Sequence, residues 1–99
     1  MKRNITYFDR VKVDVKEAKD WYRYQRPGLE KEFAKEIKKT ILKLAELPVL
    51  HAIRYKNIRI AHPRIFPYGI HYYYLENKSE IVIVAIIHNS RNPDEYPGR

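Results

Sequence analysis

The sequence predicts an α+β fold in which a helical hairpin packs on one face of a small, twisted, mostly antiparallel sheet. Two stretches with helical spacing, separated by Pro27-Gly28, occupy the first half of the chain. Strand-like runs occupy the second half, and one further strand precedes the helices. The expected order is therefore β-α-α-β-β-β. A chain of 99 residues suffices for one domain, which we expect to span residues 1–99.

Local patterns define the first strand and both helices. Arg3 to Phe8 alternates as a short strand. Asp14 is expected to cap the first helix, with Glu17 in the capping-box position. Pro27-Gly28 permits so short a turn that the second helix, from about Leu29 to Glu46, must lie antiparallel to the first. The expected inner faces are Val11, Val15, Ala18, Tyr22 and Gln25, then Leu29, Phe33, Ile37, Ile41 and Leu44.

The second half of the chain contains the remaining strands. His51 to Ala61 is strand-like, with a break expected near Lys56-Asn57. Phe66 to Leu75 forms a long run, and Pro67 suits an edge strand or the entry to a strand. Glu80 to His88 has almost no polar alternation, so we expect a central strand that is covered on both sides.

One sheet face is expected to stay partly free, because both helices cover the other. The aromatic run Tyr68 to Tyr74, beside a basic stretch, is expected to supply that free face. The tail from about Asn89 to Arg99 contains Pro93 and Pro97, and we expect it to be irregular.

Basic residues dominate the charge. Twenty Lys and Arg stand against twelve Asp and Glu, which gives a formal net charge of +8. No acidic residue occurs from Leu47 to Leu75, and this range holds Arg54, Lys56, Arg59, Arg64, His51, His62 and His71. A one-signed stretch indicates a surface for a polyanion or an acidic protein, although a solvated basic face is the alternative.

Several function classes lack support in the sequence. There is no cysteine, and the four histidines have no ligand-like spacing, so we expect no metal site and no cofactor. Ser79 and Ser90 have no nucleophile motif around them. No apolar run approaches the roughly 20 residues that span a bilayer, so we expect no membrane association and a cytoplasmic location. Two options remain, which are metal-free acid–base chemistry on RNA and binding without catalysis.

Four motifs in order resemble the RelE/ParE toxin superfamily. They are Asn57-Ile58-Arg59-Ile60, then Phe66-Pro67-Tyr68-Gly69-Ile70-His71-Tyr72, then Ile83-Val84-Ala85-Ile86-Ile87-His88, and finally Arg91-Asn92-Pro93. The preceding helical hairpin, which ends in Leu44-Ala45-Glu46-Leu47-Pro48, is also similar. The resemblance implies the toxin of a bacterial type II toxin–antitoxin pair, once called a plasmid stabilisation protein, with a helical hairpin on a curved sheet. It also implies a small acidic antitoxin as partner, with which the toxin would form a hetero-oligomer.

The superfamily has two branches with different targets. ParE-like members poison DNA gyrase without known hydrolytic chemistry, whereas RelE-like members cleave mRNA on the ribosome. The ending from His88 to Pro93 is similar to the ParE type, and Gly69 stands where nuclease members often carry an arginine. We therefore expect a binding toxin. An mRNA interferase is the first alternative, and a degenerate or merely antitoxin-binding relative is the second, so whether the chain is an enzyme stays open.

The two branches imply different roles for the candidate residues. A nuclease would use Arg59, Arg64, His88 and Tyr96, with the arginines on the phosphate and His88 or Tyr96 moving protons. A binding toxin would contact its target or antitoxin through Arg54, Lys56, Arg59, Arg64, Tyr68, His71, His88 and Arg91.

Overall fold

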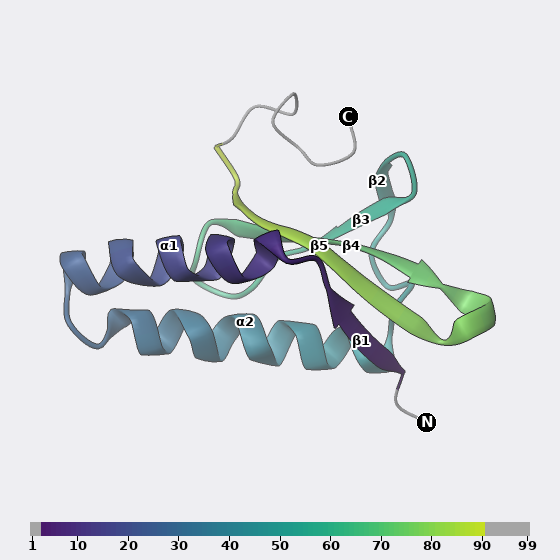
Figure 1. Cartoon of the computed structure of the whole chain (residues 1–99), viewed down its shortest axis with the longest axis horizontal. Helices are drawn as coiled ribbons and strands as arrows, with labels where there is room; N and C mark the ends of the chain where they lie inside the picture. The colour runs from purple at the N-terminus through teal and green to yellow at the C-terminus, as the bar shows by residue number, and fades with distance from the viewer. Residues whose placement is uncertain (1–2, 91–99) are drawn as a thin grey trace.

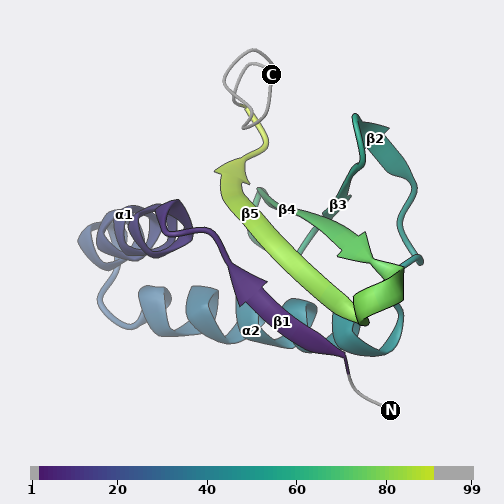
Figure 2. The same ribbon diagram turned by 45° about the vertical axis from the view of Figure 1, so that its right-hand side comes forward.

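Two antiparallel helices cover one face of a five-stranded sheet in the computed structural model, which describes residues 3–90 (Figures 1 and 2). The sheet order is β1-β5-β4-β3-β2, in which β1 runs parallel to β5 and the other neighbours are antiparallel. The predicted fold class and the order of the elements are confirmed, and the break expected near Lys56-Asn57 divides the first strand after the helices into two, so four strands follow the helices. The helices are α1 (Arg10–Gln25) and α2 (Leu29–Glu46), and the strands are β1 (Asn4–Tyr7), β2 (Ile53–Tyr55), β3 (Ile58–Ala61), β4 (Tyr68–Leu75) and β5 (Glu80–His88).

The start of α1 corrects the sequence prediction. Asp9 precedes the helix, so Asp14 lies inside α1 and is not its N-cap. The Asp14 carboxylate instead accepts a hydrogen bond of 3.0 Å from the backbone N–H of Ile86 in β5. An aspartate followed by a glutamate three residues later fits a capping box, but here the carboxylate pairs with a strand distant in sequence. This bond ties α1 to the last strand.

The tight turn between the helices is confirmed. Gly28 has φ +100°, a left-handed conformation that favours glycine. The carboxylate of Glu30 accepts hydrogen bonds from the Gly28 N–H at 2.8 Å and from Arg23 Nε at 3.2 Å. The turn is therefore fixed by side-chain bonds as well as by its backbone.

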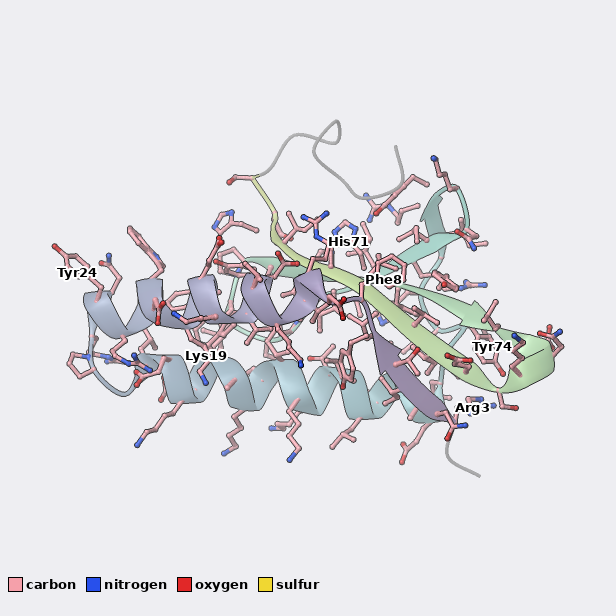
Figure 3. The ribbon with its side chains drawn as sticks, in the orientation of Figure 1. Arg3, Phe8, Lys19, Tyr24, His71 and Tyr74 are labelled. Atoms are coloured by element: carbon pink, nitrogen blue, oxygen red, sulfur yellow. The ribbon has the colours of Figure 1, made fainter. Side chains whose placement is uncertain are left out.

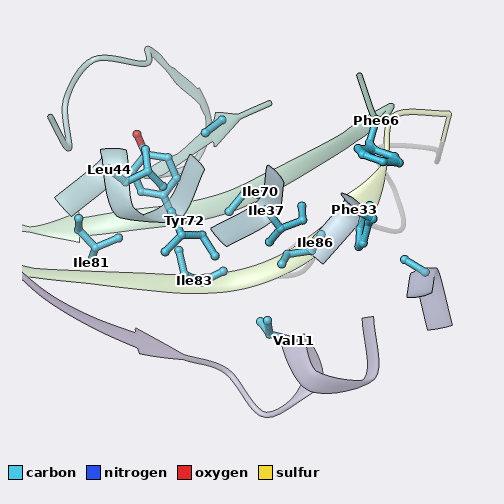
Figure 4. Packing of buried hydrophobic residues seen from close by; sticks show 13 residues of the cluster. Val11, Phe33, Ile37, Leu44, Phe66, Ile70, Tyr72, Ile81, Ile83 and Ile86 are labelled. Atoms are coloured by element: carbon cyan, nitrogen blue, oxygen red, sulfur yellow. The ribbon is translucent and has the colours of Figure 1, made fainter. Parts of the chain in front are cut away.

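The main core lies between the helices and the sheet (Figure 4). Phe33 is fully buried, and its ring lies 5.1–5.2 Å, centroid to centroid, from the rings of Tyr22, Phe66 and Tyr68. The predicted inner face of α2 is confirmed, since Phe33, Ile37, Ile41 and Leu44 are buried and Leu29 packs against them. On α1, Val11 and Ala18 are buried, whereas Gln25 is exposed.

The opposite face of the sheet is not free, which corrects a second expectation. A smaller aliphatic cluster occupies it, and Tyr73 packs there. The expected display of tyrosines is wrong, because Tyr72 is fully buried and Tyr68 and Tyr74 also pack into the core on the helix side. The expectation that β5 is covered on both sides is confirmed. The cluster consists of Ile58, Val82, Val84, Ala85 and Ile87.

A bulge in β5 explains how one strand serves both cores. Tyr72 pairs with Ile83 and His71 pairs with Ala85, so Val84 is an extra residue opposite β4. Val84 and Ala85 therefore both belong to the smaller cluster, and Ile86 returns to the helix side.

Two backbone features of the strands agree with the sequence. The break between β2 and β3 falls at the predicted place, where Lys56 has φ +49°. Pro67 directly precedes β4, which is an internal strand, so this proline occupies an entry position and not an edge.

Candidate functional site

Three histidines from separate segments meet in one hollow at the carboxyl end of β5. The hollow has a volume of about 180 Å³ and is lined by Arg54, Ile60, His62, His71, Ile87, His88 and Asn89. The antiparallel pairing of β3, β4 and β5 brings these positions together. None of these lining residues is acidic. We call this the histidine hollow.

His71 is the buried member of the group. It is 2% exposed, and its Nδ1 lies 2.9 Å from the hydroxyl oxygen of Tyr55. Burial, followed by the nearby charges of His62 and Arg54, lowers the pKa of His71 to about 4. The ring is therefore uncharged at neutral pH.

Backbone partners fix which nitrogen carries the proton in the other two histidines. His62 Nδ1 lies 3.0 Å from the carbonyl oxygen of Tyr68, which can only accept, so Nδ1 donates. His88 Nδ1 accepts from the N–H of Ser90 at 3.1 Å, so its neutral ring carries the proton on Nε2. The neutral His62 thus offers an acceptor at Nε2, and the neutral His88 offers a donor.

Gly69 lies beside the hollow, next to Ile60, His71 and Asn89, and there is no room for a side chain at this position. A Cβ built there would lie 2.8 Å from Ile60 Cγ2, closer than real Cβ atoms come. The same Cβ would lie 3.4 Å from His71 Nε2 and 3.5 Å from Asn89 Oδ1. A larger residue at this position would have to displace Ile60.

The structure does not bring Arg59 or Arg64 into the histidine hollow. Arg59 pairs with the buried Tyr72, on the helix-facing side of the sheet, and its Nη1 donates to the carbonyl oxygen of His51 at 2.6 Å. Arg64 lines a separate groove beside α2. Of the four residues expected for a nuclease, only His88 lies in the hollow, and Tyr96 is outside the described residues.

The other expected binding residues are dispersed. Arg54 and Lys56 are both exposed, but only Arg54 lines the hollow. Lys56 lies in the turn after β2. Tyr68 is half-buried, and its ring centroid lies 5.2 Å from that of His88. Arg91 is outside the described residues.

A second, partly acidic hollow on the helix side was not predicted. It has a volume of about 190 Å³ and is lined by Asp14, Glu17, Ala18, Tyr68, Ile86 and His88. His88 therefore lines two hollows that differ in charge: the histidine hollow has no acidic lining residue, whereas the second hollow includes two carboxylates. The bulge in β5 and the inward turn of Asp14 create this arrangement, and neither leaves a local signal in the sequence.

An apolar groove with a basic rim runs along α1, and we call it the α1 groove. It has a volume of about 640 Å³ and includes Tyr7, Val11 and Val15. Lys12, Lys16, Lys19 and Arg23 form a row on one side of α1, and Figure 3 shows Lys19 on the side of α1 that faces α2. The one acidic residue lining the groove, Asp20, already pairs with Lys16 at 2.9 Å and Arg23 at 3.7 Å.

Two negative findings apply to the described part of the chain. Within residues 3–90, no three His, Asp or Glu side chains converge as a metal site requires. Neither helix in that range combines the length and apolar character needed to cross a membrane.

The same fold occurs in toxin–antitoxin systems of known structure. The chromosomal ParDE system from P. aeruginosa matches with a TM-score of 0.74 at 16% identity, over 88% of this chain and 96% of that chain. The intact E. coli RelBE toxin–antitoxin complex matches with a TM-score of 0.59 at 13% identity, over 90% and 99% of the two chains. No curated protein sequence matches.

The fold is thus an α+β fold that also occurs in these systems. A family model described as the ParE toxin of the type II toxin–antitoxin system parDE matches residues 5–93. Because the match spans most of the sequence, the chain belongs to the ParE toxin family. The resemblance to the RelE/ParE superfamily is therefore confirmed.

Proposed function

We propose that this toxin acts in the cytoplasm by binding a cellular target such as DNA gyrase, and that it does not cleave RNA. The observation that carries this proposal is the packing at Gly69. The position where nuclease members often carry an arginine has no space for a Cβ, because Ile60 Cγ2 would lie 2.8 Å away. Arg59, one of the two arginines that a nuclease would use to hold a phosphate, instead donates to the backbone carbonyl oxygen of His51 on the helix side.

The binding mode predicts how variants behave. His88→Gln keeps a neutral donor and acceptor, so it should leave affinity for purified gyrase close to that of the wild type. Arg54→Ala should weaken gyrase binding in a salt-dependent manner, by about 1–3 kcal/mol if Arg54 is a hot spot. Affinity measurements at two salt concentrations, beside growth arrest in cells, test this. No measurable affinity for gyrase, with intact toxicity, would contradict the gyrase proposal.

The alternative is a ribosome-dependent, metal-independent mRNA interferase. It is favoured by the opposite tautomers of His62 and His88 in a hollow that also contains Arg54. An acceptor and a donor in one site are what proton transfer to and from a phosphate ester requires. Cleavage of translating mRNA that persists in excess chelator, and that falls about 10²–10⁴-fold in His88→Gln, would establish this alternative and overturn the binding proposal.

For the antitoxin, we propose that an acidic segment adds to the open edge of β1 and continues over the α1 groove. β1 lies at one edge of the sheet and, within residues 3–90, pairs only with β5, so its outer edge can bond main chain to main chain. The neighbouring apolar floor would bury aliphatic side chains, and the row of cations would attract carboxylates.

A pair of charge reversals tests the antitoxin site. Lys12→Glu combined with Lys19→Glu should weaken binding of the small acidic protein encoded beside this gene, with the larger effect at low salt. Lys31→Glu combined with Lys35→Glu on α2, which lies outside the α1 groove, is the matched control. Equal losses in the two double variants would indicate general charge attraction and count against the proposed site.

A further inference from the structure

A second apolar groove lies beside α2 and shares no lining residue with the α1 groove. It has a volume of about 530 Å³, and we call it the leucine groove. One wall is α2 from Glu36 to Glu46, and the other comes from Leu47 to His51 and from the turn that holds His62 and Arg64. Its apolar surface is formed by Leu42, Leu44, Leu47 and Leu50.

Leucines in this groove are exposed to an unusual degree. Leu42, Leu47 and Leu50 are 50%, 49% and 58% exposed, and Val49 and Ile53 continue the exposed apolar residues along the chain. Leu42 lies outside the inner stripe of α2, so packing of the hairpin does not account for it. Clustered exposed apolar side chains rimmed by polar groups mark interaction sites.

Two side chains of the sheet hold one wall of the groove in place. The hydroxyl of Tyr72 donates to the Pro48 carbonyl oxygen at 2.9 Å, and Arg59 Nη1 donates to the His51 carbonyl oxygen at 2.6 Å. Both donors belong to the sheet, so these two hydrogen bonds anchor the loop that carries Leu47 and Leu50 to the sheet. A surface ordered before binding loses less conformational entropy when a partner docks.

The charges around the groove select an acidic partner. Lys43 of α2 and Arg64 of the turn both line it, and neither has an ion pair within residues 3–90. Two acidic residues also line the groove: Glu36 pairs with Lys39 at 3.9 Å, and Glu46 stands against Lys43 and Arg64, so the lining keeps one net positive charge. The wall beyond α2 belongs to the stretch from Leu47 to Leu75 without acidic residues. A second copy of this chain, with a net charge of +8, would be repelled.

We propose that the leucine groove binds an acidic amphipathic helix of a second protein, while the antitoxin occupies the α1 groove. The α2 wall from Glu36 to Glu46 is about 15 Å long at 1.5 Å per residue, which matches about three turns of a docked helix. Aliphatic side chains at helical spacing would cover the leucines, and carboxylates would face Lys43 and Arg64. The inference uses the proposed function only in assigning the antitoxin to the other groove.

A synthetic peptide tests the groove directly. The probe is a helical peptide of about 15 residues with leucines along one face and glutamates elsewhere, titrated into the ¹⁵N-labelled protein. We expect saturable amide shifts at Lys43, Leu47, Leu50 and Arg64. A control peptide with alanine in place of each leucine should bind at least about tenfold more weakly. Equal binding of the two peptides, or shifts centred on the α1 groove, would overturn the inference.

Matched variants of the protein separate docking from general effects. Leu50→Glu should weaken the peptide about tenfold or more, whereas Val13→Glu, an equally exposed change on α1, should bind the peptide like the wild type. Arg64→Glu, which removes no apolar surface, provides a second test and should also weaken the peptide. Unchanged affinity in both Leu50→Glu and Arg64→Glu would overturn the proposal.

Antitoxin binding distinguishes this inference from the proposed function. Leu50→Glu should keep wild-type affinity for the antitoxin, because the two grooves share no lining residue. Loss of both peptide and antitoxin in Leu50→Glu, with the fold intact by circular dichroism, would assign the leucine groove to the antitoxin and overturn the inference. Intact antitoxin binding in Lys12→Glu/Lys19→Glu would instead contradict only the proposed antitoxin site.

Discussion

The two faces of the sheet are buried by different means. The helix side has interlocking aromatic rings around Phe33, and its buried polar groups, such as the Tyr72 hydroxyl, bond to loop carbonyls. The opposite side has a smaller aliphatic cluster, and its buried polar group is His71, which can titrate. We infer that the helix side supplies most of the stability, and that the opposite side holds the groups whose protonation can change.

The largest expected effect on stability comes from a substitution in the core on the helix side. Phe33→Ala should lower the free energy of unfolding by about 3–5 kcal/mol, because it removes a fully buried ring that contacts three other rings. Ile87→Val in the smaller cluster should cost only about 0.5–1.5 kcal/mol. Urea unfolding of both variants checks this, and an equal loss would contradict the inferred division between the faces.

The next effect is a pH dependence that arises on the opposite side. The pKa of His71 is about 4 in the folded protein and 6.5 for an ordinary histidine. Between these values the unfolded chain binds a proton that the folded chain does not, so the free energy of unfolding falls as pH drops from 6.5 to about 4. His71 alone should lower the free energy of unfolding by roughly 3 kcal/mol over this pH range.

The glutamine variant isolates the contribution of His71 from that of the carboxyl groups. His71→Gln cannot titrate but retains polar atoms that can reach Tyr55. Its unfolding free energy should therefore depend less steeply on pH than that of the wild type between pH 7 and pH 4.5. Parallel curves for the two proteins would show that His71 is not the source.

A smaller effect is expected where the histidine hollow meets the sheet. Gly69→Ala should destabilise the fold by about 1–3 kcal/mol, because its Cβ overlaps Ile60 Cγ2. The same change in an Ile60→Ala background should cost less, since the clashing methyl is absent. Gly28→Ala is a useful contrast, because nothing lies within 4 Å of its Cβ and only the φ of +100° resists the change. Thermal unfolding of Gly69→Ala, Ile60→Ala, the double variant and Gly28→Ala, each compared with the wild type, separates steric from backbone strain.

The smallest effect concerns the polar bracing of the helix side. Tyr72→Phe should cost about 0.5–1.5 kcal/mol, because it removes the hydrogen bond to the carbonyl of the buried Pro48. Tyr24→Phe should have no effect, since Tyr24 is 84% exposed at the far end of α1 (Figure 3). Chemical unfolding measures both, and a loss for Tyr24→Phe as large as that for Tyr72→Phe would contradict the bracing role.

Sequence patterns were sufficient for the elements and for most of the inner face of α2. Apolar residues at helical spacing and turn residues such as Gly28 act locally, so they can be recognised without a structure. The interpretation of Asp14 as a cap failed because its actual partner, the Ile86 amide, lies 72 residues away in the chain. Long-range pairing of this kind has no local signature.

The candidate site was less predictable than the fold. Alternation counted from Ile83 would place Ile87 on the helix side and Ile86 on the opposite side, but the bulge at Val84 shifts the register by one residue and reverses both positions. For the same reason the sequence did not indicate that His88 would line one hollow with His62 and a second hollow with Glu17. The composition did identify the acid-free stretch, but it could not show that Arg59 would turn toward the helix side.

The placement of β5 has a consequence for how the protein folds during synthesis. β5 lies between β1 and β4, although it is the last of the described strands to leave the ribosome. Asn4 pairs with Glu80, so β1 must wait for most of the chain before its partner exists. Pairing so distant in sequence is slow, and until it forms β1 and β4 expose unpaired edges. The nascent chain therefore passes through a stage in which its strands are open to pairing with another protein before its own sheet is complete.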